Sequence, residues 1–234
     1  MTRQRWIAVL RATATLVLLA GGSALADETV SVGGSRVVLI KPSAPRGSVI
    51  LMAGGDGNIR AGDHGDIHGM NGNQLVRTRH AYAARGLAVL VADAGTDLNS
   101  AVQYMAAIKR PVTVVATSLG TIRAARGIAN GARPDALVLT SGFLSQESGA
   151  GYNVMSIIGS PASLPRTLVI HHTQDTCRNT LPAGVAPFLK WSAGRARVTW
   201  VSGGSSQGDA CEALSHHGFN GIDGQIVGIA AGFR

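Results

Sequence analysis

The segment at residues 112–121, Val-Thr-Val-Val-Ala-Thr-Ser-Leu-Gly-Thr, contains the residue best suited to act as a nucleophile. A β-branched run gives way to Ala116, and a helix-prone segment begins directly after Gly120. Ser118 therefore lies at the apex of a predicted strand–turn–helix, with a small residue two positions to either side. In such a turn the strand and helix backbones nearly touch, and the serine hydroxyl is exposed at the carboxyl edge of the sheet. The pattern predicts a nucleophilic serine, although Ala116 stands where glycine is usual.

A serine becomes nucleophilic when a histidine takes its proton and a carboxylate orients that histidine. Asp175 follows a predicted strand at residues 167–171, and His217 lies in a loop before the last predicted helix. Both positions suit a site at the carboxyl edge of a sheet. We predict Ser118 as the nucleophile, Asp175 as the acid and His217 as the base.

Other residues compete for these roles. Asp175 could be a simple turn residue, since aspartate is common in turns. Three rival acids lie near the predicted base in the sequence: Asp209, Glu212 and Asp223. The alternative base is His216, which we otherwise place in the substrate pocket. Two further histidines end the strand before the acid and are predicted to pack or to line the pocket: His171 and His172.

An acyl-transfer site also needs two backbone N–H donors that face the developing oxyanion. One is predicted at Leu119, the residue after the serine. The other is expected in the glycine-rich turn at residues 53–57, where Gly55 and Asp56 are equal candidates. The same turn does not match a phosphate-binding loop, because no Gly-Lys-Ser/Thr follows it.

The only two cysteines, Cys177 and Cys211, are predicted to form a disulfide. A disulfide is the expected state of such a pair in an oxidising compartment, and two buried thiols are the alternative. Because Cys177 follows Asp175 and Cys211 precedes His217, the bond would tie the acid loop to the base loop. Closing a loop of this length stabilises a protein by about 4 kcal/mol if the bond is unstrained.

A loop at residues 63–68, Asp-His-Gly-Asp-Ile-His, gathers residue types that bind metals. Its spacing matches no zinc pattern, so we predict neither a metal nor a cofactor. Instead we expect the loop to overhang the pocket, where His64 and His68 would help to bind substrate. Asn73 is a further candidate for the pocket.

The first 26 residues have the features of a cleavable signal peptide. Arg3, Arg5 and Arg11 precede an apolar stretch at residues 12–22, and Ala24-Leu25-Ala26 fits the cleavage rule. The stretch is shorter than the roughly 20 apolar residues of a membrane span. We predict cleavage after Ala26, no membrane anchor afterwards, and a periplasmic or secreted protein.

Residues 27–234 are expected to form one domain. Loss of the three leader arginines would take the formal charge from +8 to about +5. The remaining basic residues are scattered and only 4% of the chain is aromatic, which argues against a nucleic-acid surface. The expected partner is a small-molecule or oligomeric ester substrate, and the sequence does not predict an oligomeric state.

Strand-like and helix-like segments alternate along this domain. Predicted strands lie at residues 36–40, 48–52, 87–92, 112–115, 136–140, 167–171 and 197–201. Predicted helices lie at residues 74–84, 99–109, 181–193 and 224–233, with one more after Ser118. The strands are continuous apolar runs, as expected where both faces are buried. This indicates an α/β fold with a mostly parallel central sheet flanked by helices.

These motifs together resemble the α/β-hydrolase superfamily over residues 27–234. The resemblance rests on segments 54–57, 72–79, 91–94, 116–121 and 217–219, and it is nearest to small exported bacterial hydrolases of the dienelactone-hydrolase-like branch. It implies the order serine, acid, histidine, and favours His217 over His216 because Gly218-Phe219 follows. It also implies that Asn73, Arg77 and Arg79 lie near the site, unless they cap helices or form salt bridges.

The resemblance implies an exported serine hydrolase that cleaves an ester or related acyl bond without a cofactor. Residues 142–164 are too few for a large cap domain, so we expect a minimal lid and an open pocket. Two alternatives stay open: a thioesterase, amidase or acyltransferase with the same site, or a non-catalytic binding protein of this fold.

Overall fold

The computed structural model describes residues 26–234. All but the last residue of the predicted leader therefore lies outside the described residues. Within residues 26–234, no helix is both long and apolar enough to cross a membrane.

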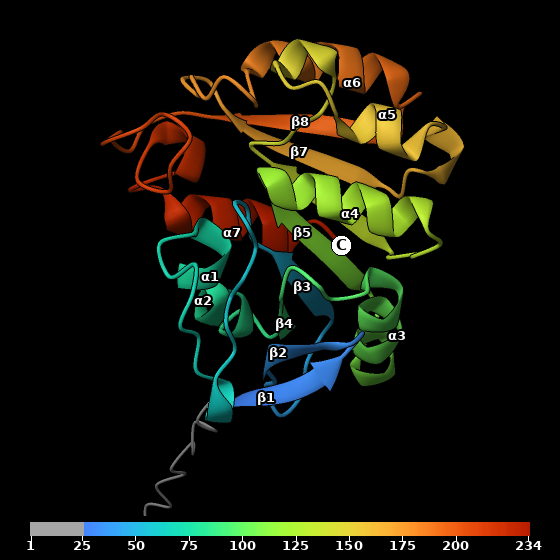
Figure 1. Cartoon of the computed structure of the whole chain (residues 1–234). Coiled ribbons are helices and arrows are strands. Elements are labelled where there is room, and N and C mark those ends of the chain that lie inside the picture. The colour runs from blue at the N-terminus through green and yellow to red at the C-terminus, as the bar shows by residue number, and fades with distance from the viewer. Residues whose placement is uncertain (1–25) are drawn as a thin grey trace, which may run out of the picture.

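A single eight-stranded sheet forms the centre of the described chain (Figure 1). Its strands are β1 (Asp27–Val32), β2 (Ser35–Ile40), β3 (Ser48–Met52), β4 (Ala88–Ala92), β5 (Val112–Thr117), β6 (Ala136–Thr140), β7 (Thr167–His172) and β8 (Ala196–Val201). Their spatial order is β1-β2-β4-β3-β5-β6-β7-β8. β1 and β2 pair antiparallel with each other, as do β2 and β4, and all later pairs are parallel. The predicted mostly parallel sheet is confirmed.

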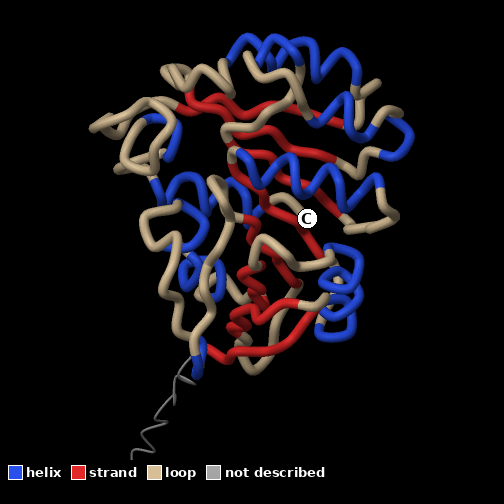
Figure 2. The backbone as a smooth tube through the Cα atoms, in the orientation of Figure 1, coloured by secondary structure: helices blue, strands red, loops and turns tan. Residues whose placement is uncertain are grey.

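Helices cover both faces of the sheet (Figures 1 and 2). One face is covered by α1 (Gln74–Arg77), α2 (Arg79–Ala83) and α7 (Asp223–Gly232). The other is covered by α3 (Leu98–Ile108), α4 (Leu119–Ala129), α5 (Val154–Ile158) and α6 (Val185–Trp191). Short 3₁₀ turns occupy Asp63–Gly65, Gln146–Ser148, Pro161–Ser163, Pro182–Gly184 and His216–Gly218.

The apolar strands form two cores because successive side chains point to opposite faces. In β5, Val114 packs in the core beneath α3 and α4, whereas Val115 packs in the core beneath α1, α2 and α7. Ile50 and Leu51 of β3 divide between the same two cores. A strand buried on both faces has no polar side, which explains the continuous apolar runs in the sequence.

The structure differs from the sequence prediction at two places before the nucleophile. β1 was not predicted; it forms a hairpin with β2 across Gly33-Gly34, a glycine pair that is itself a hairpin signal. The predicted helix at residues 74–84 is divided into α1 and α2 at Thr78, whose φ and ψ are −102° and 5°. Residues 142–164 contain only α5 and two 3₁₀ turns, as expected for a minimal lid.

Candidate active site

Ser118 occupies a strained turn between β5 and α4. Its φ of 52° and ψ of −126° lie in a region that non-glycine residues rarely adopt. The turn is held by its backbone, since the Ser118 N–H donates to the Thr140 carbonyl at 3.0 Å. The Thr121 hydroxyl in turn donates to the Ser118 carbonyl at 2.6 Å. The strained backbone conformation therefore belongs to Ser118, whose hydroxyl would have to be accessible to a substrate.

Two glycines permit the close approach around this turn. A methyl group on Gly120 would lie 2.3 Å from the Met52 carbonyl oxygen, and one on Gly54 would lie 2.9 Å from the Ser118 Cβ. Both distances are too short for any side chain. Ala116, by contrast, lies fully buried within β5, so its methyl group fits where glycine is usual.

Asp175 and His217 meet beyond the carboxyl end of β7. The Nδ1 of His217 lies 3.1 Å from the Asp175 Oδ2, and both side chains are buried. A carboxylate can only accept, so Nδ1 carries a proton and Nε2 is the ring nitrogen left free to accept one. The Ser141 hydroxyl donates to the His217 carbonyl at 2.8 Å and holds the histidine backbone. This is the arrangement that a general base requires.

Asp175 is held as an acceptor on both oxygens. The Cys177 N–H donates to Oδ1 at 2.9 Å, and the Thr180 hydroxyl donates to Oδ2 at 3.2 Å. The same Thr180 oxygen lies 3.0 Å from His217 Nδ1, so it can accept from that N–H. Thr180 therefore links Asp175 and His217, a contact for which the sequence offered no signal.

His171 lies against the opposite side of this carboxylate. Its Nε2 is 3.5 Å from the Asp175 Oδ2, and its ring makes an edge contact with Trp200 at 5.7 Å between centroids. Burial lowers the pKa of His171 to about 4, although the nearby Asp175 charge opposes this. The imidazole is therefore neutral near pH 7 and packs beside the acid without neutralising it.

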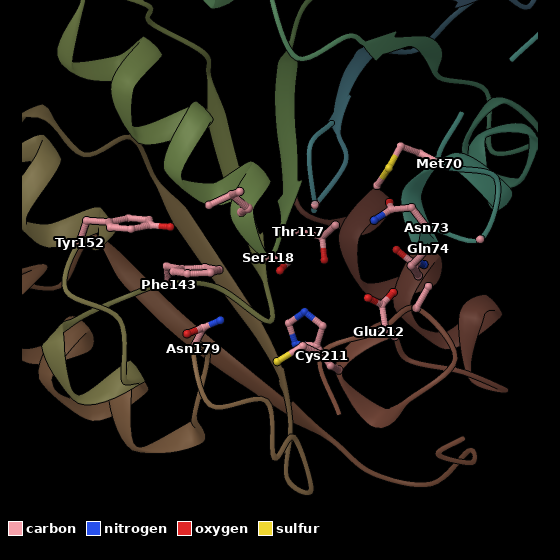
Figure 3. A pocket seen from close by; sticks show the side chains of 17 residues that line it. Met70, Asn73, Gln74, Thr117, Ser118, Phe143, Tyr152, Asn179, Cys211 and Glu212 are labelled. Atoms are coloured by element: carbon pink, nitrogen blue, oxygen red, sulfur yellow. The ribbon is translucent and has the colours of Figure 1, made fainter. Parts of the chain in front are cut away.

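A cavity of about 420 Å³ opens beside Ser118 (Figure 3). Ser118 and His217 both line it, as do Gly55 and Leu119. Ser118 also lies at the N-terminus of α4, where helix backbone N–H groups favour negative charge. The residues predicted as nucleophile, base and oxyanion donors thus line one space large enough for a small ester.

The turn after β3 is held by Arg123 of α4. Its guanidinium donates to the Ala53 carbonyl, to the Gly54 carbonyl at 3.2 Å and to the Gly55 carbonyl at 3.1 Å. Burial lowers the pKa of this guanidinium, and the Asp56 charge partly offsets the effect. Because three successive carbonyls face the arginine, the turn cannot rotate freely. Of the two candidate donors, Gly55 lines the cavity and Asp56 does not; the Asp56 carboxylate accepts from the Asn58 N–H at 2.9 Å.

Two sets of contacts restrain the loop at residues 211–218, which carries His217 and is called the base loop. The disulfide between Cys177 and Cys211 joins it to the acid loop, as predicted. Arg77 of α1 contacts Asp223 with both arms of its guanidinium, at 2.8 and 2.9 Å. It also donates to the carbonyls of Gly72, Ala213 and Gly218, at 2.5, 3.3 and 2.9 Å. Of the roles considered for Arg77, the salt bridge is the one the structure contains.

Three residues predicted for the substrate pocket lie elsewhere. His64 and His68 are exposed and do not line the cavity. Their loop is drawn to the β1–β2 hairpin, because Asp63 pairs with Arg36 at 2.7 Å and the Thr29 hydroxyl donates to the Gly62 carbonyl. His216 stacks on His172 at 4.4 Å between ring centroids and also lies outside the cavity. The pocket expectation for these three residues is corrected accordingly.

The remaining candidates have distinct partners. Asn73 lines the cavity, and its side-chain oxygen caps α1 by accepting from the Leu75 N–H at 3.1 Å. The rival acid Asp209 accepts from the Cys211 N–H at 2.8 Å, and Asp223 is occupied by Arg77. Glu212 lines the cavity. Within residues 26–234, no three His, Cys, Asp or Glu side chains gather as a possible metal site.

No known protein family matches the sequence, and no curated protein does. Many solved structures resemble the fold. TT1662 from Thermus thermophilus matches 88% of this chain and 96% of its own, with a TM-score of 0.63 and 15% identity. A dienelactone hydrolase from Anabaena variabilis matches 88% of this chain and 95% of its own, with a TM-score of 0.59 and 15% identity.

A third similar structure has a related description. XC6422 from Xanthomonas campestris, an α/β serine hydrolase without a lid, matches 87% of this chain and 94% of its own, with a TM-score of 0.55 and 14% identity. Each likeness extends over nearly the whole described chain. At such low identities, these likenesses define the fold alone.

Proposed function

We propose that this chain, which has the α/β-hydrolase fold, is an exported serine hydrolase that cleaves a carboxylic ester or related acyl bond. The observation that carries the proposal is the strained Ser118, which lines the same cavity as a histidine hydrogen-bonded to a buried carboxylate. Strain of this kind is retained where function needs it. Solved proteins with this fold include a dienelactone hydrolase and a serine hydrolase without a lid, which supports the same reaction class.

In the proposed first step, the Ser118 Oγ attacks the substrate carbonyl carbon while its proton passes to His217 Nε2. Asp175 stabilises the resulting imidazolium through Nδ1. The carbonyl oxygen becomes an oxyanion, for which the N–H groups of Leu119 and Gly55 are the proposed donors. When the intermediate collapses, His217 returns the proton to the departing alcohol and an acyl-enzyme remains.

In the second step, water attacks the acyl carbon and gives a proton to His217. The second tetrahedral intermediate expels Ser118, which recovers that proton, and the carboxylic acid leaves. Each proton that His217 accepts is returned within the same half-reaction, so the cycle needs no cofactor.

Two rival functions are separable by experiment. A thioesterase, amidase or acyltransferase would use the same three residues but would differ in rate between oxygen ester, thioester and amide of one acid. A non-catalytic binding protein would bind in the cavity without forming an acyl-enzyme. The hydrogen-bonded Asp175 and His217 favour a catalyst, because binding alone does not require an oriented base.

The proposal is tested by mass spectrometry after treatment with a fluorophosphonate, which labels activated serines. We expect one adduct on the wild type, none on Ser118→Ala, and one on Ser206→Ala, a matched change at an exposed serine. Hydrolysis of p-nitrophenyl acetate should follow the same pattern. A folded wild-type protein with its disulfide formed but no adduct would refute the catalytic function and favour the binding protein.

We further propose that the protein is exported. The Cys177–Cys211 disulfide supports this, because disulfides persist in oxidising compartments. The N-terminal residue of the protein recovered from a periplasmic or culture-medium fraction is expected to be Asp27. Recovery of the full chain, with Met1 in place and in the cytoplasm, would contradict this proposal.

A further inference from the structure

The cavity beside Ser118 has two chemically different walls (Figure 3). On one side of the serine lie the rings of Phe143 and Tyr152. On the other side lie the polar side chains of Gln74 and Glu212, with Met70 nearby, and Asn179 lies beside the rings. An ester that places its carbonyl at Ser118 must therefore extend one part toward the rings and the other toward the polar groups.

Gln74 is the most unusual residue of the polar wall. It is only 1% exposed, yet neither its amide oxygen nor its amide nitrogen has a hydrogen-bond partner within residues 26–234. Leaving a buried amide unpaired costs free energy, and buried polar groups are nearly always satisfied. Both amide atoms expose less than 1 Å² although the residue lines the cavity, so a bound ligand supplies the missing partners once the Gln74 side chain turns toward it. A hydroxyl group both donates and accepts, so it can pair with either end of the amide.

Glu212 sets the charge of this wall. It is exposed at the cavity, and no ion pair involves it in the described part of the chain. Neither lysine nor arginine is among the described residues that line the cavity. A carboxylate or phosphate on the substrate would therefore meet repulsion without compensation, although the whole chain has a formal charge of +8. A hydroxyl group can donate to the Glu212 carboxylate, which makes neutral polyols the favoured ligands.

The opposite wall suits a flat apolar group. Phe143 and Tyr152 stack with 5.8 Å between ring centroids and 6° between their planes. Phe143 is buried and Tyr152 is 48% exposed, and both residues line the cavity. Aromatic faces of this kind bind planar groups by offset stacking.

From these two walls we infer the substrate class: a neutral ester with an aromatic or similarly flat group on one side of the scissile carbonyl and a hydroxyl-bearing group on the other. This inference rests on the proposed serine hydrolase activity. Gln74 and Glu212 are its specificity residues for the hydroxylated side, and Phe143 and Tyr152 for the flat side.

Matched esters test the inference in both orientations. The first pair is propyl and glyceryl phenylpropanoate, and the second is benzyl hexanoate and benzyl gluconate. In at least one pair, the hydroxylated ester should have a kcat/KM about tenfold higher, the size expected for one or two neutral hydrogen bonds. Monobenzyl succinate, which adds a carboxylate, should be the poorest substrate. Glyceryl butanoate should be poorer than glyceryl phenylpropanoate.

Variants then assign the effect to residues. Gln74→Leu should lower kcat/KM for the preferred hydroxylated ester by about tenfold and leave its alkyl counterpart within about twofold. Gln225→Leu, the same change at an exposed position on α7, should alter neither. Glu212→Gln should reduce the discrimination against monobenzyl succinate. Tyr152→Ala should erase the advantage of the phenyl group.

The outcomes separate this inference from the proposed activity. Equal kcat/KM within both ester pairs, from a protein that a fluorophosphonate still labels at Ser118, would overturn the substrate class and leave the hydrolase intact. An equal loss on both members of a pair in Gln74→Leu would likewise overturn it, since that pattern indicates a structural role. Absence of labelling and of hydrolysis in the folded wild type would overturn both.

Discussion

Arg77 is expected to position His217, the proposed base, although Arg77 does not line the cavity. Its guanidinium joins the end of α1 to the base loop and to the start of α7, through Asp223 and three carbonyls. His217 immediately precedes Gly218, whose carbonyl accepts from the Arg77 guanidinium. Arg77→Ala would therefore release the loop that carries the base while leaving every cavity-lining side chain present.

The expected losses follow from this geometry. The Arg77 side chain is 20% exposed and that of Asp223 is 35% exposed, so water replaces only part of the lost contacts. We expect the free energy of unfolding to fall by about 3 kcal/mol, less than the sum of five charged hydrogen bonds. A base displaced by about 1 Å can lower the rate about 100-fold, and this loss should appear in kcat with little change in KM.

Steady-state hydrolysis of p-nitrophenyl acetate and urea unfolding measure the two effects. Arg77→Lys should retain part of the stability but little of the positioning, because one ammonium cannot contact all four partners. The matched control is Arg36→Ala, which also removes an arginine–aspartate pair but at a 54% exposed side chain, and it should cost less than about 1 kcal/mol without loss of kcat. A folded Arg77→Ala protein with wild-type kcat would refute the positioning argument.

Three other properties follow from the structure. Replacing Cys177 and Cys211 together by serine should lower the free energy of unfolding by about 4 kcal/mol, because the bond closes 34 residues of chain. If urea unfolding shows no such decrease, the loop-closure argument is wrong. Gly54→Ala should slow fluorophosphonate labelling at least about tenfold, because the new methyl group would lie 2.9 Å from the Ser118 Cβ and displace that residue. In the control Gly224→Ala, the new methyl group meets nothing within 4 Å, so labelling should proceed at the wild-type rate. His171 should make the protein less stable in acid. The pKa of His171 is about 4 in the folded protein and about 6.5 in an unfolded chain. As the pH drops below about 6.5, the unfolded chain therefore binds the proton first and is favoured. The free energy of unfolding should fall by about 3 kcal/mol by pH 4, and by less in His171→Gln, when urea unfolding is measured from pH 6.5 to pH 4. If the two proteins lose stability equally over this range, His171 is not the cause.

Local patterns were sufficient to predict the sheet and the turn that carries Ser118. Continuous apolar runs identify strands buried on both faces, and the small residue at position 120 reflects a contact of the turn with the neighbouring strand β3. Those features depend on a few consecutive residues. The disulfide was predictable for a different reason: the sequence contains only two cysteines, so only one pairing is possible.

The pocket was harder to predict because its residues meet only through tertiary packing. The loop at residues 63–68 was expected over the cavity, but it packs on a hairpin whose first strand, β1, was itself not predicted. The two errors have one cause, because Thr29 of the unpredicted strand β1 donates to the Gly62 carbonyl at the start of that loop. Thr180 and Arg123 likewise act on partners 37 and 70 residues away, which no local pattern reveals.

The braces around the cavity explain how a site without a large cap can remain ordered. Residues 142–164 provide little cover, so solvent reaches the loops that hold the site, and such loops open easily. Three independent restraints oppose this: the disulfide between acid and base loops, Arg77 beneath the base loop, and Arg123 beneath the turn after β3. The two arginines act on backbone carbonyls and on Asp223 and do not line the cavity, whereas Cys211 of the disulfide forms part of the cavity wall. Removing either arginine should therefore impair the proposed chemical step before it impairs binding, because the cavity wall persists while the relative placement of Ser118, His217 and the proposed oxyanion donors is lost.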